Sequence, residues 1–327
     1  MPDFKKEISE KENMQLVING ETPAWIPSFF DAFTWAGFIR LGRHPIANGN
    51  CKDIFGVEFT TTVDGQIPAN TVSRNFELKD IRKWREAMPD IDLAAINWEE
   101  EANFIRNTQV KEGQMINFNA GYVWEQLHYM MGFEEALYAL IDEPEATFEC
   151  LNAIADIYID GLRRIYPYLK PELVMFMEHI ATARGLLMSP ETYRSIIKPV
   201  HKKMFDAVIE LGALPEMHVD GYIEDVMPDY IELGIKAIQP FQIFNDINYY
   251  KEKYGILAVG GWDAFGRGNQ ADSTEEEVRA SVRMAMDTYG PGGRYVFSEN
   301  GVSPAFKHVG PVISDEARKY GLNFYKK

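Results

Sequence analysis

Cysteine is nearly absent from the chain, which has only two cysteines, Cys51 and Cys150, among 327 residues. Two cysteines provide no framework of disulfide bonds, and this fits a reducing compartment, so we expect a cytoplasmic protein. The sequence also lacks any run of about 18 apolar residues that could span a membrane. Its N-terminal segment is charged and has no apolar stretch typical of a signal peptide, so neither membrane insertion nor secretion is expected.

Basic residues are scarce as well, because 33 lysines and arginines stand against 49 acidic residues, giving a net charge of -16. No basic block occurs along the chain, so nucleic acid is not expected as a partner. Two phosphate-binding patterns are also missing. No GxGxxG follows a first strand and no GxxxxGK[ST] is present, which argues against the nucleotide-binding folds.

What the sequence does contain is a regular alternation of strand and helix patterns after Gly113. Short apolar runs with strand character lie at residues 115–118, 173–177, 215–220, 237–242, 257–260 and 295–297. Helical patterns separate them, and we expect helices at residues 122–141, 144–165, 189–211 and 273–289. Such alternation predicts right-handed βαβ units and a parallel sheet. Together with the chain length it predicts an α/β protein, a (β/α)8 TIM barrel, with residues 93–96 as one further strand.

The alternation is missing from residues 1–75, which we expect to form an N-terminal lead-in with a β-hairpin. Residues 76–327 are expected to form the barrel body, and both parts to make one domain over residues 1–327. Within the lead-in, residues 29–40 are expected to be helical. The β-branched, alternating residues around a central glycine predict the hairpin over residues 55–72.

Polar side chains gather at the carboxyl ends of the expected strands, where a TIM barrel builds its active site. His218 and Asp220 are two residues apart, so their side chains point to the same side of a strand. They form either a functional pair or a buried histidine held by a neighbouring carboxylate. The other polar residues at these ends are Asn119, Glu178, His179, Gln239, Gln242, Asp263, Ser298, Glu299 and Asn300.

Several of these candidates have a plain structural alternative. Glu178 and His179 are adjacent and must point in opposite directions, and we expect Glu178 to face the cavity. Asp263 follows two glycines that allow a ligand to approach closely, but it is equally suited to an Asx turn. Tyr122 and Trp262 are candidates to stack on an aromatic substrate, with core packing as the alternative.

Several segments resemble the uroporphyrinogen decarboxylase superfamily over about residues 50–325. The similarity lies in DIFGV at 53–57, GLLMSPETYR at 185–194, LGA at 211–213, HVDG at 218–221, GGWD at 260–263 and GPGG at 290–293. The resemblance implies a (β/α)8 barrel. It also places Arg184 beside the pocket, where this residue would hold a substrate carboxylate or anchor a loop.

The superfamily contains two chemistries, and the resemblance does not extend to the motif of the true decarboxylases. These carry an arginine-rich RQAGR-type segment near the N-terminus, whereas residues 22–27 here read TPAWIP, and only Arg40 and Arg43 lie nearby. The carboxylates of a porphyrinogen require several cationic partners. Porphyrinogen decarboxylation is therefore not expected.

The other branch comprises zinc methyltransferases that work with corrinoid proteins. Members that methylate thiols carry a His-x-Cys pair on one strand and a further cysteine near the last strand. His218 matches the histidine, whereas Asp220 and Glu299 stand where the cysteines occur. Imidazole nitrogen and carboxylate oxygen are also zinc ligands, and this harder set suits polarising a substrate oxygen. The resemblance thus implies Zn2+ held by His218, Asp220 and Glu299.

On this basis we expect a methyltransferase that moves a methyl group from an aryl methyl ether (O-demethylation) or an N-methyl donor to a corrinoid protein. The expected catalytic residues are Glu299, Asp220 and Glu178. The expected substrate-binding residues are Asn119, Tyr122, Arg184, Gln239, Trp262 and Asp263. A cofactor-free decarboxylase of tetrapyrrole metabolism is the alternative, and a non-catalytic barrel that binds a tetrapyrrole or a corrinoid protein is a third. The expected partners are the small-molecule donor and the corrinoid protein, and a homodimer remains open.

Overall fold

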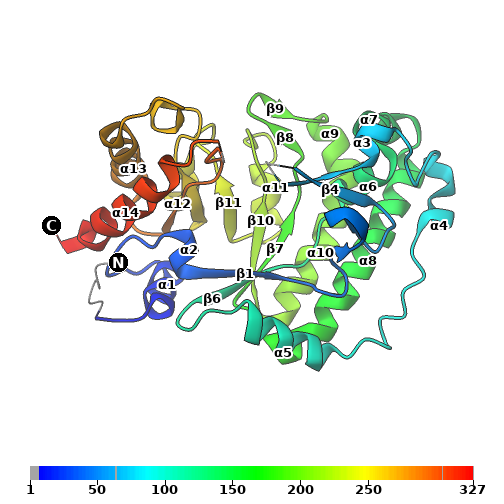
Figure 1. Cartoon of the computed structure of the whole chain (residues 1–327), viewed down its shortest axis with the longest axis horizontal. Coiled ribbons are helices and arrows are strands. Elements are labelled where there is room, and N and C mark those ends of the chain that lie inside the picture. Colours follow the sequence, from blue (N-terminus) through cyan, green and yellow to red (C-terminus); the bar gives the residue numbers. More distant parts are fainter. Residues whose placement is uncertain (1–6, 63–64, 304, 327) are drawn as a thin grey trace.

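The centre of the protein is one parallel sheet of seven strands, seen in a computed structural model that describes residues 7–62, 65–303 and 305–326. The strand order is β1-β6-β7-β10-β11-β12-β13, and the sheet curls so that helices lie around its outer face (Figure 1). The strands are β1 (Phe33–Gly37), β6 (Met115–Asn119), β7 (Leu173–Met177), β10 (Leu214–His218), β11 (Ala237–Phe241), β12 (Leu257–Gly261) and β13 (Tyr295–Ser298).

The two edges of this sheet approach each other just before β1. Ser28 forms an isolated parallel bridge with Phe297, and the amide of Phe297 donates a hydrogen bond to the carbonyl of Pro27 at 2.9 Å. Seven strands belong to the sheet within the described residues, so the full eight-stranded barrel is not confirmed. The α/β class and the curled parallel sheet of the prediction are confirmed.

Six of the seven strands lie where the sequence predicted them, and the exception is β1. Residues 29–40 were expected to be helical, but only α2 (Phe29–Ala32) is a helix, and β1 follows directly and pairs with β6. The expected strand at residues 93–96 is a turn. In β1 the burial does not alternate, since Phe33, Thr34 and Ala36 are buried and Trp35 is exposed, so periodicity cannot separate strand from helix there.

Helices cover the outer face of the sheet, and Figure 1 shows α8 and α10 on one side and α12 to α14 on the other. Their bounds are α1 (Glu10–Asn19), α5 (Trp98–Thr108), α6 (Trp124–Met131), α7 (Phe133–Asp142), α8 (Pro144–Leu169), α10 (Lys198–Leu211), α11 (Met227–Glu232), α12 (Ile247–Tyr254), α13 (Glu275–Tyr289) and α14 (Val309–Leu322). The predicted helix at 122–141 is two helices, because Gly132 between them has a φ of 95°. No helix in the described part of the chain is long and apolar enough to cross a membrane.

The predicted hairpin forms β4 (Glu58–Thr62) and β5 (Gly65–Pro68), whose connecting residues 63–64 lie outside the described residues. With β2 (His44–Pro45) and β3 (Cys51–Lys52) it makes a separate four-stranded antiparallel sheet. This sheet packs on α6, because the ring of Phe59 meets that of Tyr129 edge to face at 5.5 Å. It thereby carries the chain after β1 over the carboxyl end of the parallel sheet.

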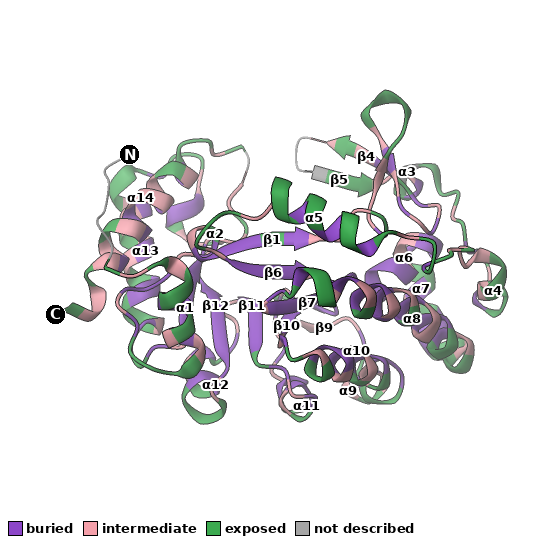
Figure 2. Cartoon of the chain, turned by 90° about the horizontal axis from the view of Figure 1, so that it is seen from below, coloured by how far each residue is buried: buried purple, intermediate pink, exposed green. Residues whose placement is uncertain are grey.

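The amino end of the parallel sheet is filled by apolar side chains. The first residue of β1, β6, β7, β11 and β12 belongs to one buried cluster, together with Met14 and Val17 of α1. Figure 2 shows the strands of the parallel sheet as the buried centre of the molecule, with exposed residues on the outer helices. One layer higher, Asn117 donates a hydrogen bond to the buried Glu216 at 2.7 Å, and burial raises the pKa of Glu216 to about 8. The carboxyl end is thus the open end of the sheet.

Candidate metal centre and adjoining pocket

His218 is the last residue of β10, and a glutamine on the neighbouring strand fixes its ring. Its Nδ1 lies against Oε1 of Gln239, the residue beside it in the register of β10 and β11. An amide oxygen can only accept, so Nδ1 donates and the lone pair resides on Nε2. Burial and the nearby charge of His179 lower the pKa of His218 to about 4. His218 is therefore a neutral imidazole, the form that binds metals.

His179 follows β7 and is held between two carboxylates. Its Nδ1 contacts Oε1 of Glu125 on α6, and its Nε2 lies 3.0 Å from Oδ2 of Asp220. Burial lowers the pKa of His179, but the hydrogen bonds and charges of Asp220 and Glu125 outweigh it and raise the pKa to about 10. The two carboxylates thus favour a positive charge at this position, which is either a proton on Nε2 or a cation bound there.

Asp220 completes the group, two residues beyond His218. Its Oδ1 accepts a hydrogen bond from Nε2 of Gln242 at 2.9 Å, which leaves Oδ2 directed at His179. Burial raises the pKa of Asp220, but His179 and His218 oppose this effect and the pKa is lowered overall. One ligand atom each from His179, His218 and Asp220 lies within 4.8 Å of the others. We call these three residues the His–His–Asp cluster.

The His–His–Asp cluster fits a divalent cation. Catalytic zinc is typically held by three protein ligands of the histidine and carboxylate type, with a fourth position left open. Two histidines and one carboxylate also hold non-haem iron, so the ligand types alone do not single out zinc. Metal-binding histidines almost always donate their other N–H to a protein oxygen. Glu125 and Gln239 provide that oxygen for His179 and His218, respectively.

Of the three predicted metal ligands, the structure brings His218 and Asp220 together but places Glu299 elsewhere. Within the described residues, Glu299 is not part of any group of candidate ligands. Its carboxyl group is close enough to Asp31 of α2 and Arg318 of α14, which form an ion pair at 2.7 Å, for their charges to act on it. Burial and Asp31 raise the pKa of Glu299. The third ligand in the cluster is instead His179.

The expectation that Glu178, rather than His179, faces the cavity is wrong. Glu178 is fully buried, and its carboxylate accepts hydrogen bonds from the amides of Val123 at 2.6 Å and Trp124 at 3.0 Å. These amides begin α6 and have no partner within the helix, so they attract an anion. Adjacent residues do point in opposite directions, as predicted, but the start of α6 takes the glutamate and leaves His179 to the cavity.

The six predicted substrate-binding residues separate into two groups. Asn119 and Tyr122 line the pocket beside the cluster, and Gln239 orients His218. The other three lie elsewhere. Trp262 is 4% exposed and donates to Ser281 of α13, and Arg184 is exposed at the turn of a small hairpin, 181–186.

Asp263 lies in a loop outside the pocket beside the cluster. Its Oδ1 accepts from the amide of Phe265 at 3.0 Å, which is the Asx turn named as its alternative. It lines a separate cavity of about 560 Å3 beside α13.

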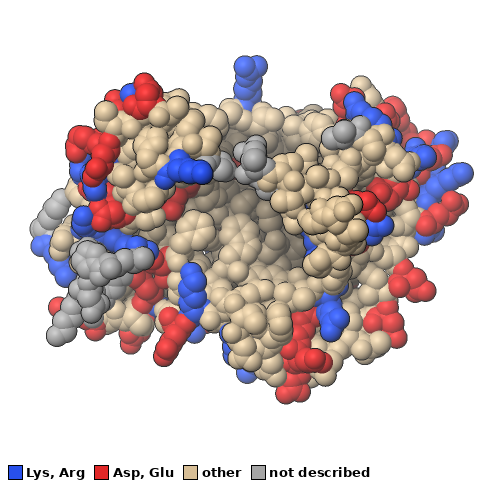
Figure 3. Space-filling view, viewed as in Figure 1, with Lys and Arg blue, Asp and Glu red and all other residues tan. Residues whose placement is uncertain are grey.

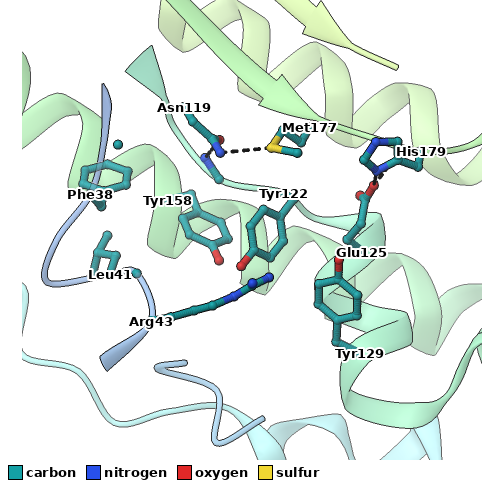
Figure 4. A pocket seen from close by; sticks show the side chains of 13 residues that line it. Phe38, Leu41, Arg43, Asn119, Tyr122, Glu125, Tyr129, Tyr158, Met177 and His179 are labelled. Carbon is teal, nitrogen blue, oxygen red and sulfur yellow. Dashed lines mark hydrogen bonds and ion pairs between the residues drawn. The ribbon is translucent and has the colours of Figure 1, made fainter. Parts of the chain in front are cut away.

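A pocket of about 360 Å3 adjoins the cluster and shares His179 with it. Figure 4 shows its walls, which come from the chain after β1, the ends of β6 and β7, and helices α6 and α8. Sequence reasoning missed four of its polar residues. These are Arg43, Glu125, Tyr129 and Tyr158. Three of them lie on helices, and Arg43 lies in an irregular segment, so none follows an expected strand and no local pattern indicates its role.

The chain belongs to the uroporphyrinogen decarboxylase (URO-D) family, whose family model matches residues 55–302. This confirms the resemblance noted in the sequence. Among solved structures, the chain is similar to a methyltransferase from Methanosarcina mazei, with a TM-score of 0.66 and 13% sequence identity. The alignment covers 98% of this chain and 100% of that chain, so the two share a fold over their whole length. A comparison with curated proteins finds no match.

Proposed function

We propose that this protein is a metal-dependent methyltransferase, which moves a methyl group from an O-methyl or N-methyl donor to a corrinoid protein. The observation that carries the proposal is the His–His–Asp cluster. In this cluster Glu125 and Gln239 contact the Nδ1 atoms of His179 and His218, so neither partner occupies Nε2. Membership of the URO-D family and the fold shared with a methyltransferase support the same reaction. The cytoplasmic location remains a prediction from the sequence.

In this proposal the His–His–Asp cluster binds the cation and the adjoining pocket binds the methyl donor. A divalent cation such as Zn2+, when bound, would supply Lewis acidity that stabilises the leaving group of the donor. His179, His218 and Asp220 would hold this cation, and Glu125 and Gln239 keep the two imidazoles in the required tautomer. The pocket orients the donor and limits its contact with water.

The methyl acceptor must come from outside the chain. Cys51 and Cys150 are the only thiols, both are buried, and neither lines the pocket. Burial also raises the pKa of Cys150 to about 12, so it is not a thiolate at neutral pH. A cobalt(I) corrinoid on a partner protein supplies the missing nucleophile. Its electron pair would form the bond to the methyl carbon, while the donor oxygen or nitrogen keeps the electron pair of the broken bond. An oxygen leaving group then takes up one proton, whereas an ammonium nitrogen becomes a neutral amine without one.

The test combines metal content with methyl transfer. Protein purified without chelator should contain about one metal ion per chain, and His218→Ala should lose most of it. With reduced corrinoid protein and a methoxylated aromatic compound, absorbance should report methylated corrinoid only when the wild-type enzyme is present. His308→Ala is the matched control, because His308 is exposed and outside the cluster. A fully active preparation without metal would refute the proposal.

A further inference from the structure

The pocket beside the cluster contains an arginine that no carboxylate neutralises. Across residues 7–62, 65–303 and 305–326, Arg43 forms no salt bridge. It donates a hydrogen bond to Oε1 of Gln66 at 3.3 Å and interacts with the hydroxyl groups of Tyr122 and Tyr129, and all three partners are uncharged. Asp53 lies nearby, but its oxygens already accept from the amides of Phe55 and Val57 and from Gln126. The guanidinium of Arg43 is therefore available to an anion from outside the chain.

Aromatic rings hold this guanidinium at the pocket. The carbon at the centre of the guanidinium lies 3.6 Å from the centroid of the Phe59 ring, which is a favourable cation–π contact. The hydroxyl groups of Tyr122 and Tyr129 lie beside it. Figure 4 shows Arg43 extended toward the hydroxyl of Tyr122. A cation fixed in this way loses little side-chain entropy when it binds an anion, and guanidinium pairs with a carboxylate through two parallel hydrogen bonds.

The remaining walls suit an aromatic ring. Tyr122 lies between Tyr129 at 5.8 Å and Tyr158 at 6.0 Å, measured between ring centroids. Burial raises the pKa of Tyr122, Tyr129 and Tyr158, so all three rings stay neutral. The ring of Tyr158 lies where a side chain at Gly121 would be, since a Cβ there would come within 2.5 Å of it. The chain thus turns tightly to leave this ring at the pocket.

The two ends of the pocket differ chemically, which defines how a ligand would be oriented. Figure 4 shows Tyr122 between Arg43 on one side and His179 on the other. At the side of His179, Oε1 of Glu125 is paired with that histidine. A volume of about 360 Å3 lies near the lower limit of about 300 Å3 for small-molecule sites, which suits one substituted ring.

We propose that the methyl donor is a methoxylated aromatic carboxylate, whose carboxylate pairs with Arg43 and whose methoxy group points toward the His–His–Asp cluster. This assignment rests on the proposed methyltransferase function and adds the class of donor. A single arginine matches a single carboxylate. The ring fills the space among the tyrosines, which are neutral and offer both faces and hydroxyl groups.

Binding by isothermal titration calorimetry tests this without any methyl transfer. Wild-type enzyme should bind 4-methoxybenzoate at least about tenfold more tightly than 4-methoxybenzamide, because a hydrogen-bonded ion pair is lost with the amide. Arg43→Gln should remove this preference, and Arg43→Lys should keep only part of it. Arg40→Gln, an exposed arginine of the same segment, is the matched control and should keep the full preference. Circular dichroism checks that each variant is folded.

The outcomes separate this inference from the proposed function. Equal binding of the acid and the amide by the wild type, or tighter binding of glycine betaine, would overturn the anionic aromatic donor. Methyl transfer from neutral methyl ethers at a rate that Arg43→Gln leaves unchanged would also overturn the anionic aromatic donor. The proposed methyltransferase function would be retained in that case. If 4-methoxybenzoate bound through Arg43 but no methylated corrinoid formed, the anion site would stand and its role as the donor site would fall.

Discussion

The amide of Gln239 decides which nitrogen of His218 is free for a metal. Gln239→Leu has a similar volume but no acceptor, so Nδ1 loses its partner and the ring loses its fixed tautomer. We expect the affinity for Zn2+ to fall about 10- to 100-fold, with the fold retained. Competition with a chromophoric chelator measures the change. Gln239→Glu keeps an acceptor and serves as the control, and a leucine variant that binds zinc as tightly as the wild type would contradict this role.

His128 of α6 should make stability depend on pH. Burial, and to a lesser extent the charge of His179, lowers its pKa from 6.5 to about 4. Between about pH 6.5 and pH 4, the unfolded chain therefore binds a proton at His128 that the folded chain does not bind. The free energy of unfolding is unaffected by this group above pH 6.5 and decreases as the pH falls below that value. At pH 5 the decrease is about 2 kcal/mol.

His128→Phe keeps a ring among Trp124, Tyr129 and Phe133 but cannot take up a proton. The difference in free energy of unfolding between His128→Phe and the wild type should shift by about 2 kcal/mol in favour of phenylalanine from pH 7.5 to pH 5. Urea titrations at both pH values measure it. A difference that does not change with pH would show that His128 titrates alike in both states.

At this scale the sequence predicts pairs within one strand and little else. His218 and Asp220 come together because residues two apart share a side, which is a local rule. The choice between Glu178 and His179 depends on where α6 begins, about 50 residues earlier in the chain. Arg43 reaches its pocket only because a separate sheet places Phe59 beneath it. Such contacts between distant segments leave no pattern in a single sequence.

Among the elements, α6 connects the fold to the site, since its first amides bind Glu178 and its Glu125 holds His179. Glu178→Ala would leave two buried amides without a partner, so we expect the free energy of unfolding to fall by about 1–3 kcal/mol. Glu178→Gln keeps one acceptor and should cost less. Chemical denaturation measures both variants.

The control for Glu178 is Glu134→Ala, in the first turn of α7, where the acidic residue is exposed. There only the interaction with the helix dipole is lost, so the cost should stay below about 1 kcal/mol. An equal cost for Glu178→Ala and Glu134→Ala would mean that the burial of the two amides at α6 contributes nothing.

Elements with a clear period were predictable, and those without one were not. The capping box at Thr274 and Glu277 opens α13 as its sequence indicates. By contrast, β1 is an apolar segment directly after a four-residue helix, and only its pairing with β6 makes it a strand. Gly132 divides one helical pattern into α6 and α7 because the chain there needs a positive φ.

The whole molecule combines a sealed end with an open end. Buried apolar residues fill the amino end of the sheet, while the His–His–Asp cluster and the pocket beside it lie at the carboxyl end. Alternation of strands and helices predicts this division, because parallel strands all end on one side. The closure through Ser28 and Phe297 was not predictable, since it joins segments more than 260 residues apart.

At the scale of the molecule, the charge distribution argues against uroporphyrinogen, the substrate after which the family is named. The net charge is -16, and Figure 3 shows a hollow face bordered mainly by uncharged residues, with only scattered Lys and Arg side chains around it. Within the described residues of the pocket, Arg43 is the only arginine or lysine. One guanidinium cannot pair with the many carboxylates of uroporphyrinogen, and leaving them unpaired in a low-dielectric pocket is costly.

We therefore expect no conversion of uroporphyrinogen to coproporphyrinogen, as measured by chromatography of the oxidised porphyrins. The same result is expected at about 1 M salt. At this concentration charges separated by more than about 3 Å are largely screened, which weakens the repulsion between the protein and the substrate. Screening does not supply the missing cationic partners, so the substrate still should not bind. Formation of coproporphyrinogen at low salt would overturn the methyltransferase assignment in favour of a decarboxylase. Formation only at high salt would show that overall repulsion, rather than the missing arginines, keeps this substrate out.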